Sequence, residues 1–219
     1  MKNSFNQDNY SYWIFDLDNT LYPEDNKIFS QVKMKIIKFI SLELRLDFKN
    51  ADLERKRLYN LYGTSLRGLM TEYKIIPNKF LDYVHDIDLS AIIKNLDLNV
   101  ALQKLKGEKY IFTNGSFKHA ENVLNQLGIK DNFKSIHSIE TCNYIPKPSQ
   151  EAYDMVIKTE QISIDKSIMF EDTLWNLKTA KKLGMATVLI SSKNHLLENN
   201  KSDYIDYHIT DLVEFLNQS

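Results

Sequence analysis

The sequence predicts an α/β fold in which helices flank a parallel sheet and an all-helical segment follows the first strand. In the C-terminal half, short apolar runs alternate with helix-like segments, which is typical of parallel strands joined by right-handed crossovers. Tyr12–Phe15 is a buried strand of the same kind near the N-terminus. Residues 23–98 contain no convincing strand. We therefore expect a core domain of residues 1–22 and 99–219, and a helical domain of residues 23–98.

The core domain is expected to contain several more strands. They are Tyr110–Thr113, Phe133–Ser138, Ser167–Phe170, Met185–Ile190 and Tyr204–His208. Residues that favour helix ends predict the helices between them. One helix runs from an N-cap at Ser116 to Gly128, a second opens at Pro148, a third runs from Thr173 to Gly184, and Thr210 caps a short last one.

The helical domain begins with an apolar stripe that repeats every four residues, as on one face of an amphipathic helix. The stripe consists of Ile28, Val32, Ile36, Ile40 and Leu44. Further helices are expected at Asp52–Leu61, Leu66–Tyr73 and Asn78–Val84, with Gly63 and Pro77 between them. Because ligands bind beyond the carboxyl ends of parallel strands, a segment inserted after the first strand is expected to lie over that crevice.

Composition narrows the class of protein. With 28 basic and 29 acidic residues, the net charge of −1 favours neither nucleic acid nor an anionic membrane as a partner. The single cysteine, Cys142, excludes an internal disulfide and a multi-cysteine metal site. Residues 1–9 lack the apolar core of a signal peptide, and no run is long enough to span a bilayer. We expect a cytoplasmic protein, of an oligomeric state that the sequence does not indicate.

Two carboxylates, Asp16 and Asp18, follow the first strand directly. Two negative charges this close repel each other unless a cation or a shared proton offsets them. A magnesium ion, which prefers oxygen ligands, would do so. The alternative is a surface turn, since Asp and Asn are common in turns.

Polar residues also follow the other strands. Thr113 and Asn114 end the second strand, Glu171 and Asp172 end a later one, and Lys147 lies in the loop before a predicted helix. Asn176 follows Asp172 by four residues and shares its helical face. All of these positions fall at one edge of the predicted sheet. Phosphoryl transfer needs such a combination of anion-binding and metal-binding groups.

Each of these residues also has an ordinary structural interpretation. Thr113 is compatible with a turn, Lys147 with a solvated side chain, and the acidic pair with a helix N-terminus, where acids are common. Their coincidence at one edge is more specific than any single member.

Together, the motifs resemble those of the haloacid dehalogenase (HAD) superfamily. The motifs are Asp16-Leu17-Asp18-Asn19-Thr20, Thr113-Asn114-Gly115, Lys147-Pro148, and Glu171-Asp172 with Asn176. The helical domain matches the cap that some members carry between the first two motifs. Leu61–Leu69, Phe80–His85 and Phe170–Thr173 are similar to the pyrimidine 5′-nucleotidase branch.

The resemblance implies roles for the core residues. Asp16 would attack phosphorus to form an aspartyl-phosphate, and Asp18 would act as general acid and base. Mg²⁺ would be held by the Asp16 carboxylate, the Asp18 backbone carbonyl and Asp172. Thr113 and the Asn114 amide would bind phosphate oxygens, and Lys147 would offset negative charge. Glu171 and Asn176 would orient the metal and the lysine.

The resemblance also suggests where a leaving group binds in the cap. The candidate pocket residues are Tyr62, Gly63, Thr64, Arg67 and Gly68, and Tyr62 or Tyr59 would stack on a base. The alternative is that the aromatics are core residues and the glycines stop helices. For His85, packing or hydrogen bonding is the expected role.

These features predict a magnesium-dependent phosphatase of small phosphomonoesters, with a nucleoside 5′-monophosphate as the expected substrate. A sugar-phosphate phosphatase or a phosphosugar mutase would use the same carboxylates. A receiver-like or non-catalytic regulatory protein that binds phosphate is the alternative from a different class.

Overall fold

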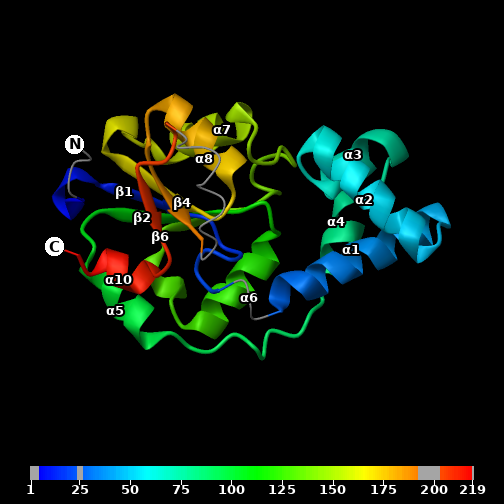
Figure 1. Cartoon of the computed structure of the whole chain (residues 1–219), viewed down its shortest axis with the longest axis horizontal. Coiled ribbons are helices and arrows are strands. Elements are labelled where there is room, and N and C mark those ends of the chain that lie inside the picture. The colour runs from blue at the N-terminus through cyan, green and yellow to red at the C-terminus, as the bar shows by residue number, and fades with distance from the viewer. Residues whose placement is uncertain (1–4, 24–26, 192–202, 219) are drawn as a thin grey trace.

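One sheet of six parallel strands forms the centre of the described chain. The computed structural model describes residues 5–23, 27–191 and 203–218. The strand order is β3-β2-β1-β4-β5-β6, so the first strand in the chain is central (Figure 1). The strands are β1 (Tyr12–Phe15), β2 (Glu108–Phe112), β3 (Ser135–His137), β4 (Ser167–Glu171), β5 (Ala186–Ile190) and β6 (Tyr207–Ile209). The predicted parallel sheet is confirmed.

The register of the central strands brings their carboxyl ends to the same level. Phe15 of β1 pairs with Ile111 of β2 on one side and with Phe170 of β4 on the other. The amide of Asp16 continues the ladder by donating to the Phe170 carbonyl at 2.9 Å. The residues that follow Phe15, Phe112 and Phe170 therefore meet at one edge.

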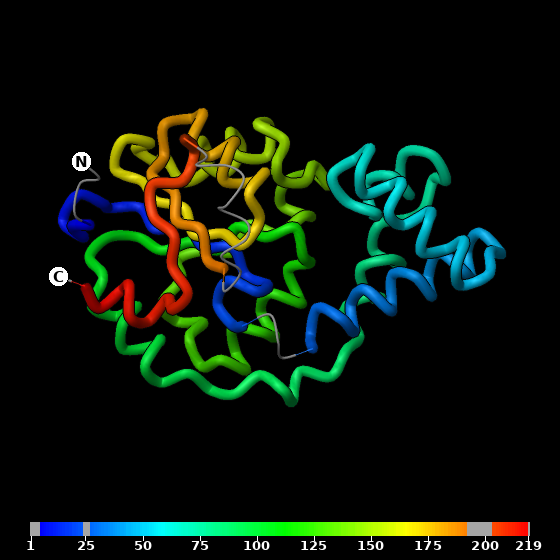
Figure 2. The backbone as a smooth tube through the Cα atoms, viewed as in Figure 1, coloured from blue at the N-terminus to red at the C-terminus, as the bar shows by residue number. Residues whose placement is uncertain are grey.

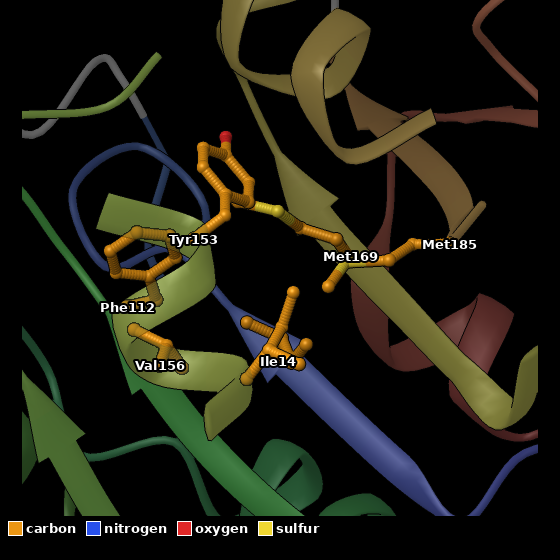
Figure 3. A pocket seen from close by; sticks show the side chains of 7 residues that line it. Ile14, Phe112, Tyr153, Val156, Met169 and Met185 are labelled. Carbon is orange, nitrogen blue, oxygen red and sulfur yellow. The ribbon is translucent and has the colours of Figure 1, made fainter. Parts of the chain in front are cut away.

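Helices cover both faces of the sheet, and alternate residues of β1 point to opposite faces. Trp13 and Phe15 pack in a cluster with α5 (Leu96–Lys104), α6 (Phe117–Leu127) and α10 (Leu212–Leu216). Ile14 packs in a second cluster with α7 (Gln150–Glu160) and α8 (Leu174–Leu183). Figure 3 shows this second cluster from close by. Tyr153 and Val156 of α7 lie next to Ile14 of β1 and Met169 of β4, and the contact between them is apolar. Short 3₁₀ helices lie at Gln7–Asn9, Lys130–Asn132 and Ile164–Lys166.

The four helices after β1 lie to one side of the sheet and share a cluster of their own (Figure 2). They are α1 (Ile28–Leu44), α2 (Phe48–Tyr62), α3 (Ser65–Tyr73) and α4 (Pro77–Val84). One residue from the sheet side, Ile139 in the loop after β3, is buried in this cluster. Among the described residues, no helix combines the length and apolar character needed to cross a bilayer.

The division into two domains stays a prediction, but its proposed boundary can be placed on the structure. The boundary between residues 98 and 99 falls inside α5, a helix that the sequence patterns did not predict. Leu98 and Leu102 of this helix pack in the same cluster as the sheet. The Asn95 side chain caps the helix by accepting from the Leu98 amide at 2.9 Å.

Two predicted helix starts are wrong. We expected a helix to open at Pro148, but α7 begins at Gln150. The Asn114 side chain accepts from the Lys147 amide at 2.8 Å and donates to its carbonyl at 3.1 Å, and a turn precedes the helix, in which the Ser149 amide donates to the Pro146 carbonyl. The Lys147–Pro148 peptide bond is cis. The last helix is capped by Asp211 rather than Thr210, because the Asp211 carboxylate accepts from the Glu214 amide.

The loop before β2 gives a test of close backbone packing. Gly107 has φ +89°, and a Cβ added there would lie 2.3 Å from the Ser11 carbonyl oxygen. Gly107→Ala is therefore expected to lower the free energy of unfolding by about 2 kcal/mol or more, measured by urea denaturation. The adjacent variant Lys106→Ala, which removes only an exposed ion pair with Asp8, should change it by less than about 1 kcal/mol. Equal losses in the two variants would contradict this explanation.

Candidate active site

Lys147 lies at the centre of the polar groups that follow the strands. Its side chain is 1% exposed, and its ammonium group donates to three oxygens. These are Asp16 Oδ1 at 2.7 Å, Glu171 Oε1 at 2.7 Å and the Phe112 carbonyl at 2.6 Å. The three N–H groups of the lysine are thus all used, and they bind the ends of β1, β2 and β4 together.

Asp16 follows β1 and is 7% exposed. Burial raises the pKa of Asp16 to about 7; the charge of Lys147 opposes this shift and that of Glu171 adds to it. From the described residues, its second oxygen, Oδ2, accepts only a long hydrogen bond of 3.3 Å, from the Thr20 hydroxyl. One oxygen of Asp16 is therefore tied to the lysine, and the other is weakly bound.

Glu171, the last residue of β4, is bound on both of its oxygens. Oε1 accepts from Lys147 and from the Asn176 amide group, and Oε2 accepts from the Thr173 amide at 2.7 Å. Burial raises the pKa of Glu171, and Lys147 opposes this shift. Asn176 is itself buried in the first turns of α8. The structure thus brings Glu171 and Asn176 together around the lysine.

Asp172 lies next to this group and is more open. Its Oδ2 accepts from the Asn19 side chain at 3.3 Å, and its Oδ1 accepts from the Thr173 hydroxyl at 3.0 Å. Burial, followed by the negative charge of Asp16, raises the pKa of Asp172 to about 6. Asp16 and Asp172 both have a long contact on Oδ2 and a raised pKa. The ionised form of each carboxyl is therefore disfavoured.

These carboxylates fit a divalent cation. Asp16, Glu171 and Asp172 each offer an oxygen, and the three oxygens lie within 4.8 Å of one another. Lys147 supplies one positive charge against three negative ones. Glu171 is already saturated by hydrogen bonds, so Asp16 and Asp172 are the side chains available for a metal. Asn19 Oδ1, buried beside Asp172, has no hydrogen-bond partner in the described chain, as expected if a hydrated ion belongs there.

The Asp18 side chain is not part of that cluster. Its Oδ1 accepts from the Tyr22 hydroxyl and lies 2.8 Å from His119 Nε2. Burial opposes a charge on Asp18, but His119 and Tyr22 outweigh it and lower the pKa of the carboxyl to about 2. The predicted metal ligand at this position is the backbone carbonyl, so the side chain is free for another role.

Thr113 and Asn114 follow β2 at the same edge. The Thr113 side chain is buried, and its hydroxyl accepts from the Gly115 amide at 2.9 Å. A Cβ added to Gly115 would lie 3.2 Å from Thr113 Oγ1 and 3.6 Å from Asp18 Oδ2, so these oxygens border one small space. The Asn114 side chain holds the Lys147 backbone, as described above. Phosphate binding by Thr113 and by the Asn114 amide stays a prediction.

Several residues of the predicted cap pocket have packing roles in the structure. Gly63 ends α2 with φ +81°, and the Thr64 hydroxyl caps α3 by accepting from the Arg67 amide. A Cβ added to Gly68 would lie 2.7 Å from a Leu58 methyl group, so this glycine lets α2 and α3 approach closely. The Tyr62 hydroxyl donates to Glu72 at 2.8 Å. Four of the five predicted pocket residues thus have a structural role that does not require a ligand.

Arg67 and Tyr59 are cap side chains that make no side-chain hydrogen bond to any described residue. Arg67 is partly buried and makes no ion pair with any described residue. Burial and the negative charges of Asp172 and Glu171 raise the pKa of Tyr59, so its hydroxyl lies within their field. Gly63 also lies against the Lys147 loop, since an added Cβ would be 3.5 Å from Pro146 Cγ. The α2–α3 turn thus lies beside the predicted active site.

Sequence reasoning did not anticipate three residues at the site. Thr20 contacts Asp16, while Tyr22 and His119 both contact Asp18. A signal for His119 was present: it lies in the first turn of a helix that begins at the carboxyl edge of the sheet. Tyr22 follows Asp18 by four residues, but the chain between them forms a turn, so no helical spacing indicated the contact.

Known proteins resemble this chain both in sequence and in structure. The family described as haloacid dehalogenase-like hydrolase matches residues 13–190. Phosphate metabolism protein 8 of Saccharomyces cerevisiae is 27% identical over 208 residues, which cover 85% of this chain and 62% of that protein. The chain thus spans less than two thirds of this relative. Glyceraldehyde 3-phosphate phosphatase of Methanocaldococcus jannaschii is 25% identical over 218 residues, covering 93% of this chain and 94% of that protein.

Solved structures show the same fold. A HAD phosphatase from Thermococcus onnurineus has a TM-score of 0.62 at 18% identity, covering 94% of this chain and 95% of that one. L-2-haloacid dehalogenase from Xanthobacter autotrophicus has a TM-score of 0.61 at 11% identity, covering 94% and 97%. At these identities the likeness concerns the fold alone.

The raised carboxyl pKa values predict a pH-dependent affinity for Mg²⁺. Protons compete with the metal for Asp16, with a pKa of about 7, and for Asp172, with a pKa of about 6. The affinity is therefore expected to rise at least about tenfold between about pH 5 and pH 8, measured by calorimetry with Mg²⁺ alone. Asp172→Asn should weaken binding and flatten this dependence. A pH-independent affinity in the unmodified chain would contradict the assignment.

The same shifts predict the pH dependence of metal-free stability. A carboxyl whose folded pKa lies above its unfolded value binds more protons when folded. Its contribution is therefore lost as the pH rises through the folded pKa. The melting temperature without metal should fall as the pH is raised from about 5 to about 8, and added Mg²⁺ should reverse the fall. Asp16→Asn should show a smaller fall.

Proposed function

Because the chain belongs to the haloacid dehalogenase-like hydrolase family, we propose that it is a magnesium-dependent phosphatase of small phosphomonoesters. The observation that carries the proposal is the placement of Asp16 between Lys147 and Asp172, with Asp18 and Thr113 at the same sheet edge. A nucleophile, a metal site and an acid–base group are thereby within reach of one phosphoryl group.

Asp16 is the proposed nucleophile. Its Oδ1 is held by Lys147, and its Oδ2 has a long contact to the Thr20 hydroxyl. Attack on phosphorus by this carboxylate forms an aspartyl-phosphate and divides one difficult displacement into two steps. Lys147 fixes the carboxylate for the attack and offsets the negative charge that gathers at phosphorus.

Asp18 is the proposed general acid and base. In the first step it protonates the oxygen of the departing alcohol, and in the second it takes a proton from the attacking water. The low pKa of about 2 keeps Asp18 ionised, which is the form that accepts the proton in the second step. A phosphate dianion bound next to Asp18 raises the pKa of the carboxyl by like-charge repulsion, which favours the protonated form that the first step needs.

Asp16, Asp172 and the Asp18 carbonyl are the proposed magnesium ligands, with Glu171 and Asn176 orienting Lys147 beside them. Magnesium supplies positive charge that draws the phosphate to two buried carboxylates and stabilises the transferring group. Thr113 and the Asn114 amide are proposed to bind the remaining phosphate oxygens.

A nucleoside 5′-monophosphate is the proposed substrate. The support is the similarity of Leu61–Leu69 and Phe80–His85 to the pyrimidine 5′-nucleotidase branch, together with two available side chains in the cap. Tyr59 offers a ring that is half exposed, and Arg67 offers a guanidinium without an ion-pair partner among the described residues. A base and a sugar hydroxyl would engage groups of these kinds.

A small sugar phosphate is the second candidate substrate. The archaeal relative that matches nearly the whole chain is named for glyceraldehyde 3-phosphate, a three-carbon phosphate ester. The packing contacts of Tyr62, Thr64 and Gly68 within the helical cluster also favour a leaving-group site smaller than a full nucleoside pocket.

Substitution of the nucleophile gives the direct test of the chemistry. Asp16→Asn should reduce phosphate release from p-nitrophenyl phosphate with Mg²⁺ by about a thousandfold or more, because the amide is a poor nucleophile. The fold should persist, since Lys147 keeps Glu171 and the Phe112 carbonyl as partners. Circular dichroism and melting temperature provide the control. Phosphate release at the unmodified rate would contradict the assignment of Asp16.

A substrate screen separates the two candidates. Phosphate release would be measured over nucleoside monophosphates and sugar phosphates, each with Mg²⁺ and with a chelator. A higher kcat/KM for pyrimidine nucleotides would support the nucleotide proposal, and a preference for a three-carbon phosphate would support the second candidate. Conversion to an isomerised sugar phosphate without phosphate release would indicate a mutase and contradict both.

A further inference from the structure

We infer that Tyr22 and His119 are positioning residues for Asp18: both hold its Oδ1 oxygen, so that Oδ2 is the atom that exchanges the proton with the substrate. This inference rests on the proposed phosphatase function, and it assigns to the two oxygens of Asp18 different tasks. Neither Tyr22 nor His119 was among the candidate residues of the sequence.

The two donors reach the same oxygen from different elements. The Tyr22 hydroxyl comes from the segment after β1 and donates to Asp18 Oδ1. His119 Nε2 comes from the first turn of α6 and lies 2.8 Å from the same atom. Within the described residues, Asp18 Oδ2 accepts no hydrogen bond. The carboxyl group is therefore fixed at one oxygen and open at the other.

The open oxygen faces the predicted phosphate-binding residues. The space above Gly115 is bordered by Asp18 Oδ2 and by the Thr113 hydroxyl, as the position of an added Cβ shows: 3.6 Å from the first oxygen and 3.2 Å from the second. A glycine here leaves that space unfilled. An oxygen of a phosphate ester bound by Thr113 would thus lie on the Oδ2 side of Asp18.

The surroundings of His119 indicate a dedicated role. The residue is 2% exposed, and its Nδ1 has no hydrogen-bond partner in the described chain. A buried ring nitrogen without a partner is costly. Among the described residues, the hydrogen bond of this ring is the contact of Nε2 with Asp18, and this contact offsets part of the cost of burying the ring.

His85 supports His119 from the other side. The two imidazole rings stack with centroids 4.5 Å apart and planes inclined by 14°. His85 Nδ1 is in turn 2.9 Å from the hydroxyl of Ser116, which caps α6 by accepting from the His119 amide at 3.2 Å. The ring of His119 is thereby held in the orientation that points Nε2 at Asp18.

The proton transfers assigned to Oδ2 complete the reaction. As an Asp16 oxygen bonds to phosphorus and the bond to the ester oxygen breaks, the proton on Asp18 Oδ2 passes to that oxygen and the alcohol leaves. Water then attacks the aspartyl-phosphate, gives its proton to Oδ2, and the bond between phosphorus and Asp16 breaks. Ester and water become alcohol and phosphate, and both carboxyl groups return to their first state.

The leaving group provides a test that a merely structural role would not affect. Phenolate is a stronger base than p-nitrophenolate, so cleavage of phenyl phosphate depends more on protonation by Asp18. Tyr22→Phe should lower kcat/KM for phenyl phosphate by about 10- to 100-fold, and for p-nitrophenyl phosphate by at least about fivefold less. The ratio kcat/KM is measured because it reports the step in which the alcohol leaves.

Two further comparisons serve as controls. Tyr73→Phe removes a matched hydroxyl–carboxylate contact, the 2.8 Å bond from Tyr73 to Glu54 on the helical cluster, and should leave both kcat/KM values unchanged. His119→Gln keeps a donor group and should lose less activity on phenyl phosphate than His119→Leu does. If a His119 variant does not fold, Tyr22→Phe decides.

The outcomes separate this inference from the proposed function. Equal losses on the two esters, or no loss on phenyl phosphate in Tyr22→Phe, would overturn the assignment of Tyr22 and His119 while leaving the phosphatase intact. If the unmodified chain with Mg²⁺ releases no phosphate from either ester, the proposed function fails and the inference fails with it.

Discussion

The active-site edge depends on a single buried cation. Lys147 uses all three of its N–H groups on Asp16, Glu171 and the Phe112 carbonyl, and thereby joins the ends of three strands. Removing one partner of a buried ion pair typically costs about 3–5 kcal/mol, because the remaining charge stays buried. One lysine does not neutralise three carboxylates, however. The remaining negative charge favours the binding of a divalent cation at this edge. Lys147 therefore positions the carboxylates but does not balance their charge.

Much of the site follows from rules that apply to any parallel sheet. Asp16 and Thr113 come directly after apolar strands and Glu171 is the last residue of one, and the alternation of strands with helices places all strand ends at one edge. The burial of Asp16 and Glu171 then follows from the place of their strands, since β1 and β4 are central in the sheet. The order of the strands was not needed for this prediction. That is why the polar residues of the core could be grouped from the sequence, although they are far apart along the chain.

The remaining features depend on contacts that no local pattern records. The start of α7 was misplaced because the Asn114 side chain, remote in sequence, binds the backbone of Lys147. The partners of Asp18 were missed because Tyr22 reaches it across a turn and His119 from another helix. In the cap, the close contact of Gly68 with Leu58 was not expected from the sequence, and its place in a leaving-group pocket stays a prediction. In each case a tertiary contact, rather than a propensity, decides the role of the residue.

The loop from β3 to α7 belongs to two hydrophobic units at once. Ile139 is buried among α1–α4, and the Tyr144 hydroxyl donates to Asn78 of α4, yet Lys147 of the same loop lies in the sheet edge. A local opening of the helical cluster that released Ile139 would therefore disturb the same loop that holds Lys147 at the sheet edge. Each such opening would loosen the attachment of Lys147 to Asp16. The free energy of local unfolding of α1–α4 would thus set how often Lys147 moves away from Asp16 and leaves its negative charge without a partner.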